Sequence, residues 1–476
     1  MIFNSIEFFI FLPLVFMVYW LIPSSQYRKQ NVVILLASYV FYGWWDWRFL
    51  SLIMLSSALD YGIGIALAKK QDKRQRKYLL ALSCLVNIGL LAYFKYYNFF
   101  LDSFIDAFRF FGNQIEFDRL KVILPVGISF YTFQTLSYSI DVYKRKIEPS
   151  KDAVSFFAFV SFFPQLVAGP IERASNLLPQ FNVKRKFDLS ASVDGMRQIL
   201  WGFFKKIVIA DNCAVLVNDI FAHHQDYSGS TLAIGAILFA FQIYGDFSGY
   251  SDIAIGTARL FGFQLMKNFA FPYFSRDIAE FWRRWHISLS TWFRDYVYIP
   301  LGGSRLSKSK TVRNTMIIFL VSGFWHGANW TFVFWGFFHA LLFMPLLLTA
   351  KNRNHIKEVE SSIPSFRMVL SILRTFLLVS LAWVFFRAEH VSDALYIIRK
   401  IFTDIWQPIS IDMPMFLWPM IFAFLLWEWI HRTKEHGLQF AVFKKSRGLR
   451  WLIYYSIILA IVLLGNHSES FIYFQF

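Results

Sequence analysis

Apolar runs long enough to cross a membrane recur along the entire chain and alternate with short polar and basic stretches. A transmembrane helix needs about 20 predominantly apolar residues, so the series predicts an all-α polytopic membrane protein with about 11–12 transmembrane helices. We treat residues 1–476 as a single membrane domain. The runs expected to cross the membrane are residues 5–22, 31–45, 49–68, 78–98, 122–142, 196–221, 231–256, 314–330, 331–350, 368–386, 414–431 and 451–466. The last part of this series, residues 314–350, is expected to form a hairpin that turns near Ala328 and Asn329.

Two apolar segments do not fit this simple alternation. Residues near 153–170 lie between basic clusters, and residues near 269–303 mix aromatic side chains with many charges. Both are predicted to be re-entrant or interfacial helices on the cytoplasmic side. Irregular backbone at membrane depth is tolerated only where protein or a water-filled cavity covers it. The sequence therefore predicts a central cavity that opens to the cytoplasm.

Composition and charge agree with a membrane protein. Hydrophobic residues make up 56% of the chain and charged residues 17%, whereas soluble domains carry about 25% charged residues. The net charge of +17 is spread over clusters between apolar runs, as the positive-inside rule expects, which excludes a nucleic-acid binder and indicates contact with anionic membrane lipids. Arg28 and Lys29 follow the first run, so the N-terminus is predicted to be extracytoplasmic and the first loop cytoplasmic, in a membrane protein of the inner-membrane type. The two cysteines form no disulfide or metal motif.

The first candidate site is the stretch from Glu280 to Tyr296. As one continuous helix it would gather aromatic residues on one face and turn arginines toward a polar cavity. An interfacial helix with aromatic anchors explains the tryptophans, but it does not explain His286 well. The residues on these two faces are Trp282, Trp285, Leu289, Trp292 and Tyr296, and Arg283, Arg284 and Arg294.

The second candidate site is His326, inside a long apolar run. An ionisable side chain at membrane depth must face the bundle interior or a water-filled cavity. Gly323 and Gly327 leave room for another backbone or for a substrate. The residues alone leave function and simple packing open for His326. His339 lacks such flanking glycines, so packing is expected there.

A third polar cluster, from Tyr244 to Asp252, contains two carboxylates. Asp246 or Asp252 could orient a histidine by accepting its ring N–H. Ser251 or Asp252 could instead cap a helix that begins at Ile253, and capping is the favoured role for one of the carboxylates. The sequence contains no phosphate-binding loop, HExxH motif or nucleophilic serine elbow, so ATPase, zinc-peptidase and serine-hydrolase functions lose support.

Several long motifs resemble one known family. They cover residues 38–42, 124–130, 168–170, 246–252, 281–290, 296–303 and 323–329. In these residues the sequence resembles the membrane-bound O-acyltransferase family, and within it the bacterial branch that acetylates alginate and peptidoglycan. The resemblance implies a ring of helices around a central cavity with re-entrant cytoplasmic helices. The residues from Gly465 to Phe476 depart from the alginate members, which leaves the polymer open.

The resemblance also implies a reaction. His326 matches the family's catalytic histidine and His286 its second motif residue; Trp285, Trp325, Asn329, Asp246, Ser251 and Asp252 are expected to support them. We expect no tightly bound cofactor or metal. The expected co-substrate is acetyl-CoA or an acyl carrier, and the expected partner is a periplasmic SGNH-type or esterase-like acetyltransferase that serves a polysaccharide acceptor.

In the expected mechanism, Arg283, Arg284 and Arg294 hold the donor phosphates, because guanidinium groups match phosphate oxygens. His326 acts as general base, and His286 orients the thioester or donates to the oxyanion. A covalent acetyl-histidine is the variant that stays open. A transporter or flippase for a lipid-linked sugar and a non-catalytic envelope scaffold are the two alternatives, and neither requires both histidines.

Overall fold

The computed structural model describes residues 1–112, 119–120, 123–167, 169–356, 363–440, 446–465 and 469–472. Within these ranges every regular element is a helix, which confirms the predicted all-α class. The described chain divides into two compact units, one formed by Met1–Gly195 with Ala254–Met266 and the other by Met196–Ile253 with Lys267–Phe476. The division into two compact units does not test the predicted single membrane domain, which stays a prediction.

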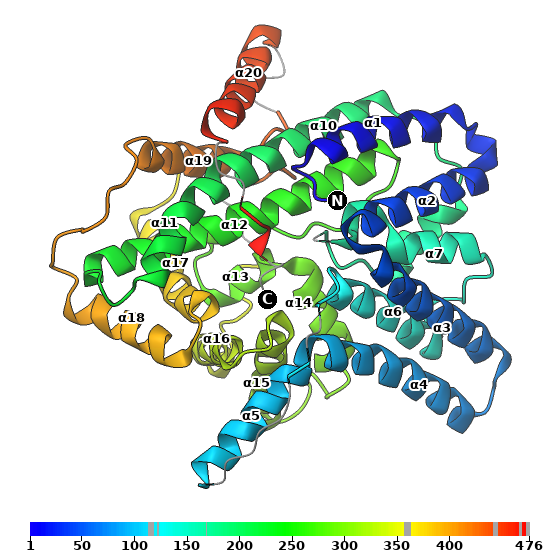
Figure 1. Ribbon diagram of the computed structural model, residues 1–476, viewed down its shortest axis with the longest axis horizontal. Coiled ribbons are helices and arrows are strands. Elements are labelled where there is room, and N and C mark those ends of the chain that lie inside the picture. Colours follow the sequence, from blue (N-terminus) through cyan, green and yellow to red (C-terminus); the bar gives the residue numbers. More distant parts are fainter. Residues whose placement is uncertain are drawn as a thin grey trace. The chain divides into compact units, whose positions relative to one another are not determined.

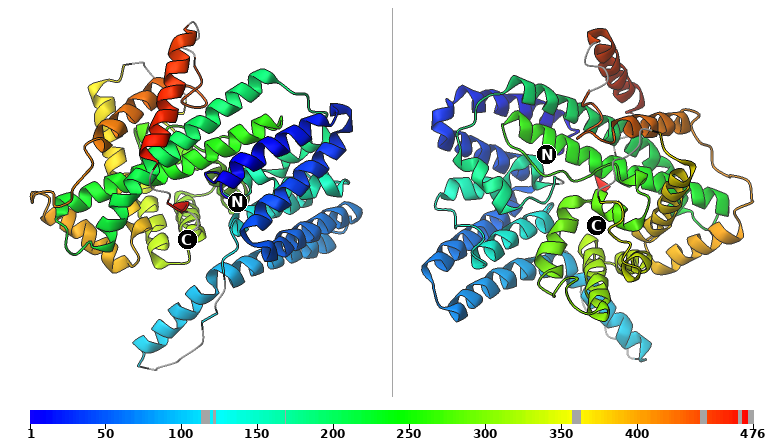
Figure 2. Two further views of the ribbon diagram at one scale, coloured as in Figure 1. Left: turned by 45° about the horizontal axis from the view of Figure 1, so that its top comes forward. Right: turned by 180° about the vertical axis from the view of Figure 1, so that it is seen from behind.

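The first unit contains the N-terminal helices. One of its buried polar residues is Asp60, a carboxylate that accepts hydrogen bonds from Ser83 at 2.5 Å, Ser139 at 2.6 Å and Asn87 at 2.7 Å. These bonds join three helices that lie side by side, α3, α4 and α6 (Figures 1 and 2). The helices of this unit are α1 (Ile6–Leu21), α2 (Tyr27–Asp46), α3 (Leu50–Lys69), α4 (Lys73–Leu91), α5 (Tyr97–Phe110), α6 (Ile128–Tyr143), α7 (Ala153–Ser161), α8 (Phe163–Leu166) and α9 (Ala174–Leu177), with short 3-10 or π segments at Ser24–Gln26, Trp47–Phe49, Ala92–Tyr96 and Leu178–Asn182.

The second unit carries the histidines singled out in the sequence. Two long helices, α10 (Leu189–Phe203) and α12 (Gly229–Leu260), contribute residues to both units. The others are α11 (Asp211–Ala222), α13 (Ile278–Arg284), α14 (Ile287–Phe293), α15 (Lys308–His326), α16 (Trp330–Leu348), α17 (Phe366–Arg387), α18 (Val391–Thr403), α19 (Leu417–His431) and α20 (Arg447–Leu464), with short segments at Phe204–Ala210, Pro272–Phe274 and Arg294–Tyr298.

Many of these helices are apolar enough to cross a membrane, and the protein is a multi-pass membrane protein. In the described part of the chain, six helical segments meet the length and composition for a span: Ser24–Lys69, Lys73–Phe110, Gly229–Leu260, Trp330–Leu348, Phe366–Arg387 and Arg447–Leu464. Three apolar helices are shorter, at Ile6–Leu21, Ala153–Leu166 and Leu417–His431. Each predicted run overlaps a helix, while the count of 11–12 spans stays a prediction.

The misfit segment near 153–170 is interrupted as its prolines suggest. Helix α7 ends at Ser161, Phe162 is not helical, and α8 is only four residues long. Ala168, part of one family motif, lies outside the described residues. The break confirms irregular backbone here.

Apart from the four-residue α9, two helices in the described part of the chain escaped the sequence prediction, α5 and α18. Both are amphipathic, so neither contains a continuous apolar run. In α18 the buried side chains are Ala394, Ile397 and Ile401, at the three- and four-residue spacing of one helix face. The side chains of His390 and Asp393 form a capping box that fixes its start.

Helices α15 and α16 form the predicted hairpin, which turns through Gly327–Asn329. Their backbones approach so closely that a Cβ added to Gly323 would lie 3.3 Å from the Gly336 Cα and would overlap the Phe332 carbonyl oxygen. The space left by Gly323 is therefore filled by another backbone, which was one of the two predicted uses. This packing fixes the end of α15, where His326 lies.

Candidate active site

His326 is the last residue of α15 and is only 2% exposed. Its Nδ1 atom lies 2.6 Å from the Ser322 carbonyl oxygen, one turn earlier in the same helix. A carbonyl oxygen only accepts, so Nδ1 carries the proton and Nε2 carries the lone pair of the neutral ring. The rings of Trp335 and Phe386 pack against it, with centroids 4.9 and 5.6 Å away. His326 thus lies among packed aromatic rings, and we call this aromatic surrounding of the histidine the aromatic chamber.

His286 lies at a break between two short helices, α13 and α14. The prediction of one continuous helix across this stretch is therefore wrong. His286 has a φ of 41°, a left-handed conformation that costs energy for any residue with a side chain. The Ile287 N–H donates to the Asn268 carbonyl at 2.9 Å, which compensates for the interrupted helix. The bend brings the histidine inward instead of leaving it at the edge of an aromatic face.

The side chain of Asn268 holds the His286 ring, and sequence reasoning missed this residue. Its Oδ1 accepts from His286 Nδ1 at 3.0 Å and from the Ser288 hydroxyl at 2.9 Å. Its Nδ2 donates to the Ser251 hydroxyl at 3.1 Å, so Ser251 of α12 supports His286 indirectly. A lone asparagine between Lys267 and Phe269 carries no sequence motif, and no local signal could have identified it.

The structure brings the two predicted histidines together. Their ring centroids are 6.3 Å apart. His286 directly precedes α14, and His326 ends α15, 39 positions after the start of α14. His286 has no exposed surface. Burial, with a smaller contribution from nearby His326, lowers the pKa of His286 well below its usual value, so its ring is neutral. Within the described chain, His286 Nε2 has no hydrogen-bond partner. Because Nδ1 donates in each ring, the lone pair of the neutral imidazole lies on Nε2 in both histidines.

Tryptophans form the walls around the two histidines. The Trp325 ring lies 5.0 Å from His326 and 6.1 Å from His286. Trp285 is buried, and its ring lies 5.0 Å from Trp383. These distances indicate a structural role for Trp285 and place Trp325 at the chamber itself.

The three predicted phosphate-binding arginines have different surroundings. Arg284 pairs with Glu280 at 2.8 Å, and Arg283 donates to the Asn352 carbonyl at 2.8 Å. Burial is the main reason why the pKa of Arg283 is lowered. The side chain of Arg294 is 59% exposed and pairs only with its neighbour Asp295 among the interactions described. Of the three, Arg294 is therefore the most available to an incoming anion.

A cavity of about 250 Å³ lies beside the helix turn that precedes His326. Its lining includes Arg294, Arg353 and Ser322, whose carbonyl oxygen accepts a hydrogen bond from His326. The rest of the lining is mostly apolar and aromatic, with residues such as Phe319 and Phe343. The cavity combines cationic groups with an apolar wall close to the histidine.

The carboxylates of the third polar cluster contact neither histidine. Asp246 and Asp252 both lie within α12, so neither caps a helix at Ile253, and that prediction is wrong. Asp246 pairs with Lys206 at 2.8 Å and accepts from the Ile472 N–H at 2.7 Å. Asp252 pairs with Lys205 at 2.6 Å. Lysines two helices away in the sequence neutralise these charges, which is why the cluster can be buried.

Asn329 and His339 have structural surroundings. Asn329 caps α16: its side-chain oxygen accepts from the Thr331 N–H at 3.0 Å, and its Nδ2 donates to the Glu389 carbonyl at 2.8 Å. His339 is fully buried and packs as expected, with ring centroids 5.0 Å from both Trp282 and Trp335. Neither of its ring nitrogens finds a hydrogen-bond partner in the described chain.

Comparison with known proteins places this arrangement in context. Residues 41–363, which include both histidines, match the model of the membrane-bound O-acyltransferase family. The chain is 42% identical to the "probable alginate O-acetylase" of Azotobacter vinelandii over 83% of this chain and 76% of the relative. It is 35% identical to the peptidoglycan O-acetyltransferase of Helicobacter pylori, over 84% of this chain and 79% of that protein. A teichoic acid D-alanyltransferase of Streptococcus thermophilus is 30% identical over 45% of this chain and 55% of its own length.

Proposed function

This chain belongs to the membrane-bound O-acyltransferase family and is a membrane O-acetyltransferase, and we propose that it passes an acetyl group from cytoplasmic acetyl-CoA toward hydroxyls of an extracytoplasmic polysaccharide. The observation that carries the proposal is the pair of buried histidine rings, 6.3 Å apart, in an aromatic chamber. The relatives named for alginate and peptidoglycan acetylation support an acetyl group and a polymer acceptor.

His326 is the general base in this proposal. Its Nε2 removes the proton from an acceptor hydroxyl as the hydroxyl oxygen attacks the thioester carbonyl carbon. The C–S bond then breaks, the acetyl group stays on the acceptor oxygen, and the proton passes from His326 to the departing thiolate. Positioned general bases contribute roughly 10²–10⁴ to a rate. The hydrogen bond to the Ser322 carbonyl supports this role, because it leaves the lone pair on Nε2.

His286 orients the reacting groups. In the hydrogen-bond pattern with Asn268, its neutral ring has no N–H at Nε2, so donation to an oxyanion would require the opposite tautomer. An acceptor hydroxyl or a water molecule can instead donate to its Nε2. We therefore favour orientation of the acceptor over the expected donation to the oxyanion.

The donor enters through the cavity that Arg294 and Ser322 line. Arg294 and Arg353 attract the donor phosphates, and the apolar wall accommodates the pantetheine arm. Arg294→Ala should raise the KM for acetyl-CoA several-fold while kcat changes little. Arg284→Ala serves as a comparison, because its guanidinium is already engaged by Glu280 and its loss should act through stability.

The acceptor side requires a second protein. We propose a periplasmic SGNH-type or esterase-like acetyltransferase that completes transfer to the polysaccharide, with this chain in the bacterial inner membrane and its N-terminus extracytoplasmic. The clusters of basic residues between apolar runs support that orientation.

The test is acetyl transfer by the full chain reconstituted in liposomes with labelled acetyl-CoA, the partner and polymer. His326→Ala should reduce transfer by about 10³-fold or more, the scale of a lost general base. His223→Ala is the matched control, because His223 is an exposed histidine whose ring contacts only its own helix turn. Thermal unfolding in detergent confirms that each variant is folded.

Full activity in a folded His326→Ala variant would contradict the proposal. Movement of a lipid-linked sugar without acetyl transfer would favour a flippase. Normal envelope acetylation after replacement of both histidines would favour a scaffold.

A further inference from the structure

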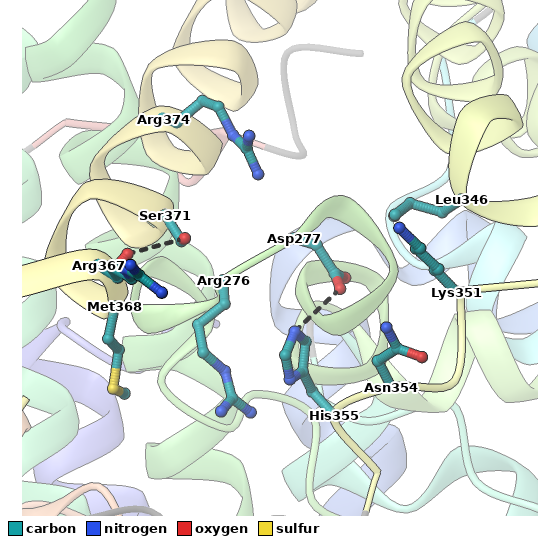
Figure 3. A pocket seen from close by; sticks show the side chains of 10 residues that line it. All are labelled: Arg276, Asp277, Leu346, Lys351, Asn354, His355, Arg367, Met368, Ser371 and Arg374. Carbon is teal, nitrogen blue, oxygen red and sulfur yellow. Dashed lines mark hydrogen bonds and ion pairs between the residues drawn. The ribbon is translucent and has the colours of Figure 1, made fainter. Parts of the chain in front are cut away.

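A second cavity, of about 320 Å³, lies in the same unit as the histidines but is lined by none of the residues assigned above (Figure 3). Its positively charged walls come from three places in the sequence: Arg276 before α13, Lys351 and His355 after α16, and Arg367 and Arg374 on α17. The cavity is at the lower end of the volumes typical of small-molecule sites, roughly 300–1,000 Å³.

Positive charge in this cavity exceeds negative charge. Its one acidic lining residue, Asp277, lies 3.5 Å from His355 and also caps α13 by accepting from the Glu280 N–H. Arg276 is engaged by Glu280, with hydrogen bonds of 3.0 Å to each carboxylate oxygen. For Lys351, Arg367 and Arg374, the described chain supplies no carboxylate within ion-pair distance.

The position of Arg374 strengthens the case for a ligand. It lies two turns into α17, a helix apolar and long enough to cross a membrane. A charged side chain inside such a helix is costly unless it faces a cavity, a partner or the membrane surface. Arg374 lines the cavity together with Arg276 and Arg367 (Figure 3). An anion bound there would supply the missing partner.

We propose that this cavity is a phosphate-binding site, filled by a phosphate group of a soluble nucleotide or of an anionic lipid headgroup. Two arginines on one helix face and a lysine opposite can surround phosphate oxygens with charge-assisted hydrogen bonds. The segment Lys351–His355 contributes to both cavities: Lys351 and His355 line this one, and Arg353 lines the donor cavity. Occupancy here would therefore fix the segment that carries one wall of the donor cavity.

The test measures binding and needs no acetyl transfer. The purified full chain is placed in nanodiscs of zwitterionic lipid, and binding of inorganic pyrophosphate is measured by calorimetry. The measurement is made on wild type and on Arg294→Ala, a variant that removes a cation of the donor cavity and should leave this site unchanged. A parallel arm uses native mass spectrometry in mixed phosphatidylglycerol and phosphatidylcholine to count retained anionic lipids. The variant is Arg367→Gln with Arg374→Gln. The matched control, Lys308→Gln with Arg399→Gln, removes two exposed charges of the same unit from α15 and α18.

Each lost guanidinium should weaken binding by about tenfold, the scale of a charge-assisted hydrogen bond, while the control variant binds like wild type. Arg374→Lys should retain part of the affinity, since it keeps the charge but loses the two-pronged geometry. Weaker binding of soluble phosphates by the double variant supports the site with a soluble ligand. Fewer retained anionic lipids in the double variant support the site with a lipid headgroup.

Failure of the wild type to bind any of these probes would overturn the proposal, and so would equal binding by the double variant. Intact binding together with failed acetyl transfer would count against the proposed function alone. The two proposals can therefore fail separately.

Discussion

His326 and His286 face the same chamber, yet different kinds of structure hold them. His326 ends a helix of 19 residues, and its ring is anchored to a backbone carbonyl of that same helix. His286 sits between two helices of seven residues each, in a left-handed conformation. Its ring is anchored to Asn268, which is itself held by side chains from other elements.

The difference determines what can displace each ring. The anchor of His326 is backbone, so no side-chain substitution at Ser322 removes it; only a change in how α15 packs on α16 moves it. The anchor of His286 is a side chain, so one substitution can release it. Substitutions between α15 and α16 should therefore displace His326, whereas substitutions at Asn268 should release His286. The two effects on acetyl transfer can be measured separately.

The largest effect is expected where α15 meets α16. A Cβ on Gly336 would overlap the Phe319 carbonyl oxygen and lie 3.3 Å from the Gly323 Cα. Gly336→Ala should force the helices apart, destabilise the protein by about 3 kcal/mol and displace His326. Thermal unfolding and acetyl transfer measure both consequences.

Gly89→Ala is the control for this substitution. Gly89 lies in α4, and a Cβ there meets nothing within 4 Å, so alanine should leave stability equal or slightly higher through its better helix propensity. If Gly336→Ala were as stable and active as Gly89→Ala, close packing of the hairpin would not position His326.

The next effect is expected at the anchor of His286. Asn268→Ala leaves His286 Nδ1 and two serine hydroxyls without their partner, which should cost about 2 kcal/mol of stability. We expect kcat to fall about 10–100-fold, because the imidazole is no longer held in one orientation. Ser251→Ala removes only the bond to Asn268 Nδ2 and should cause a smaller loss of the same kind. A larger fall in kcat for Ser251→Ala than for Asn268→Ala would contradict the proposal that Asn268 holds His286 directly and that Ser251 acts through Asn268.

The same contrast explains which parts of the site could be predicted from sequence. A continuous apolar run interrupted by Gly327 and Asn329 signals a helical hairpin, so the location of His326 followed from local pattern alone. The tryptophan spacing around His286 is typical of a helix, and nothing local reveals the break. That break depends on Asn268, whose backbone and side chain act from 18 residues away.

The arginines show the same limit. The i,i+4 spacing of Glu280 and Arg284 could have indicated an ion pair, and the structure has one. The bond from Arg283 to the Asn352 carbonyl had no such signal, because it joins residues 69 positions apart. Charge patterns in the sequence identify side chains that could bind an anion. Tertiary contacts then determine which of these side chains are already engaged by other groups of the protein.

A third prediction uses the neutral state of buried His286. The folded pKa lies well below the unfolded value of about 6.5, so below that pH the unfolded chain binds a proton that the folded chain does not. Stability from this residue is fully present above pH 6.5 and falls with decreasing pH, by up to about 1.4 kcal/mol per unit. Unfolding of wild type and His286→Asn, measured between pH 5 and about 7, should give a flatter pH profile for the variant. Parallel profiles would mean that burial does not lower the pKa of His286 in the folded protein.

The smallest effect is expected at Asn329, which the family resemblance places beside the catalytic histidine but which the structure uses as the cap of α16. Asn329→Ala should cost about 1 kcal/mol of stability, the usual loss for a helix cap, and leave the KM for acetyl-CoA unchanged. Asn329→Asp should recover most of that loss, since a carboxylate oxygen also accepts from the Thr331 N–H. A rise in KM without a change in unfolding temperature would instead assign Asn329 to the donor. His326 would then share its chamber with a substrate-binding residue of α16, and α16 would do more than pack against the helix that carries His326.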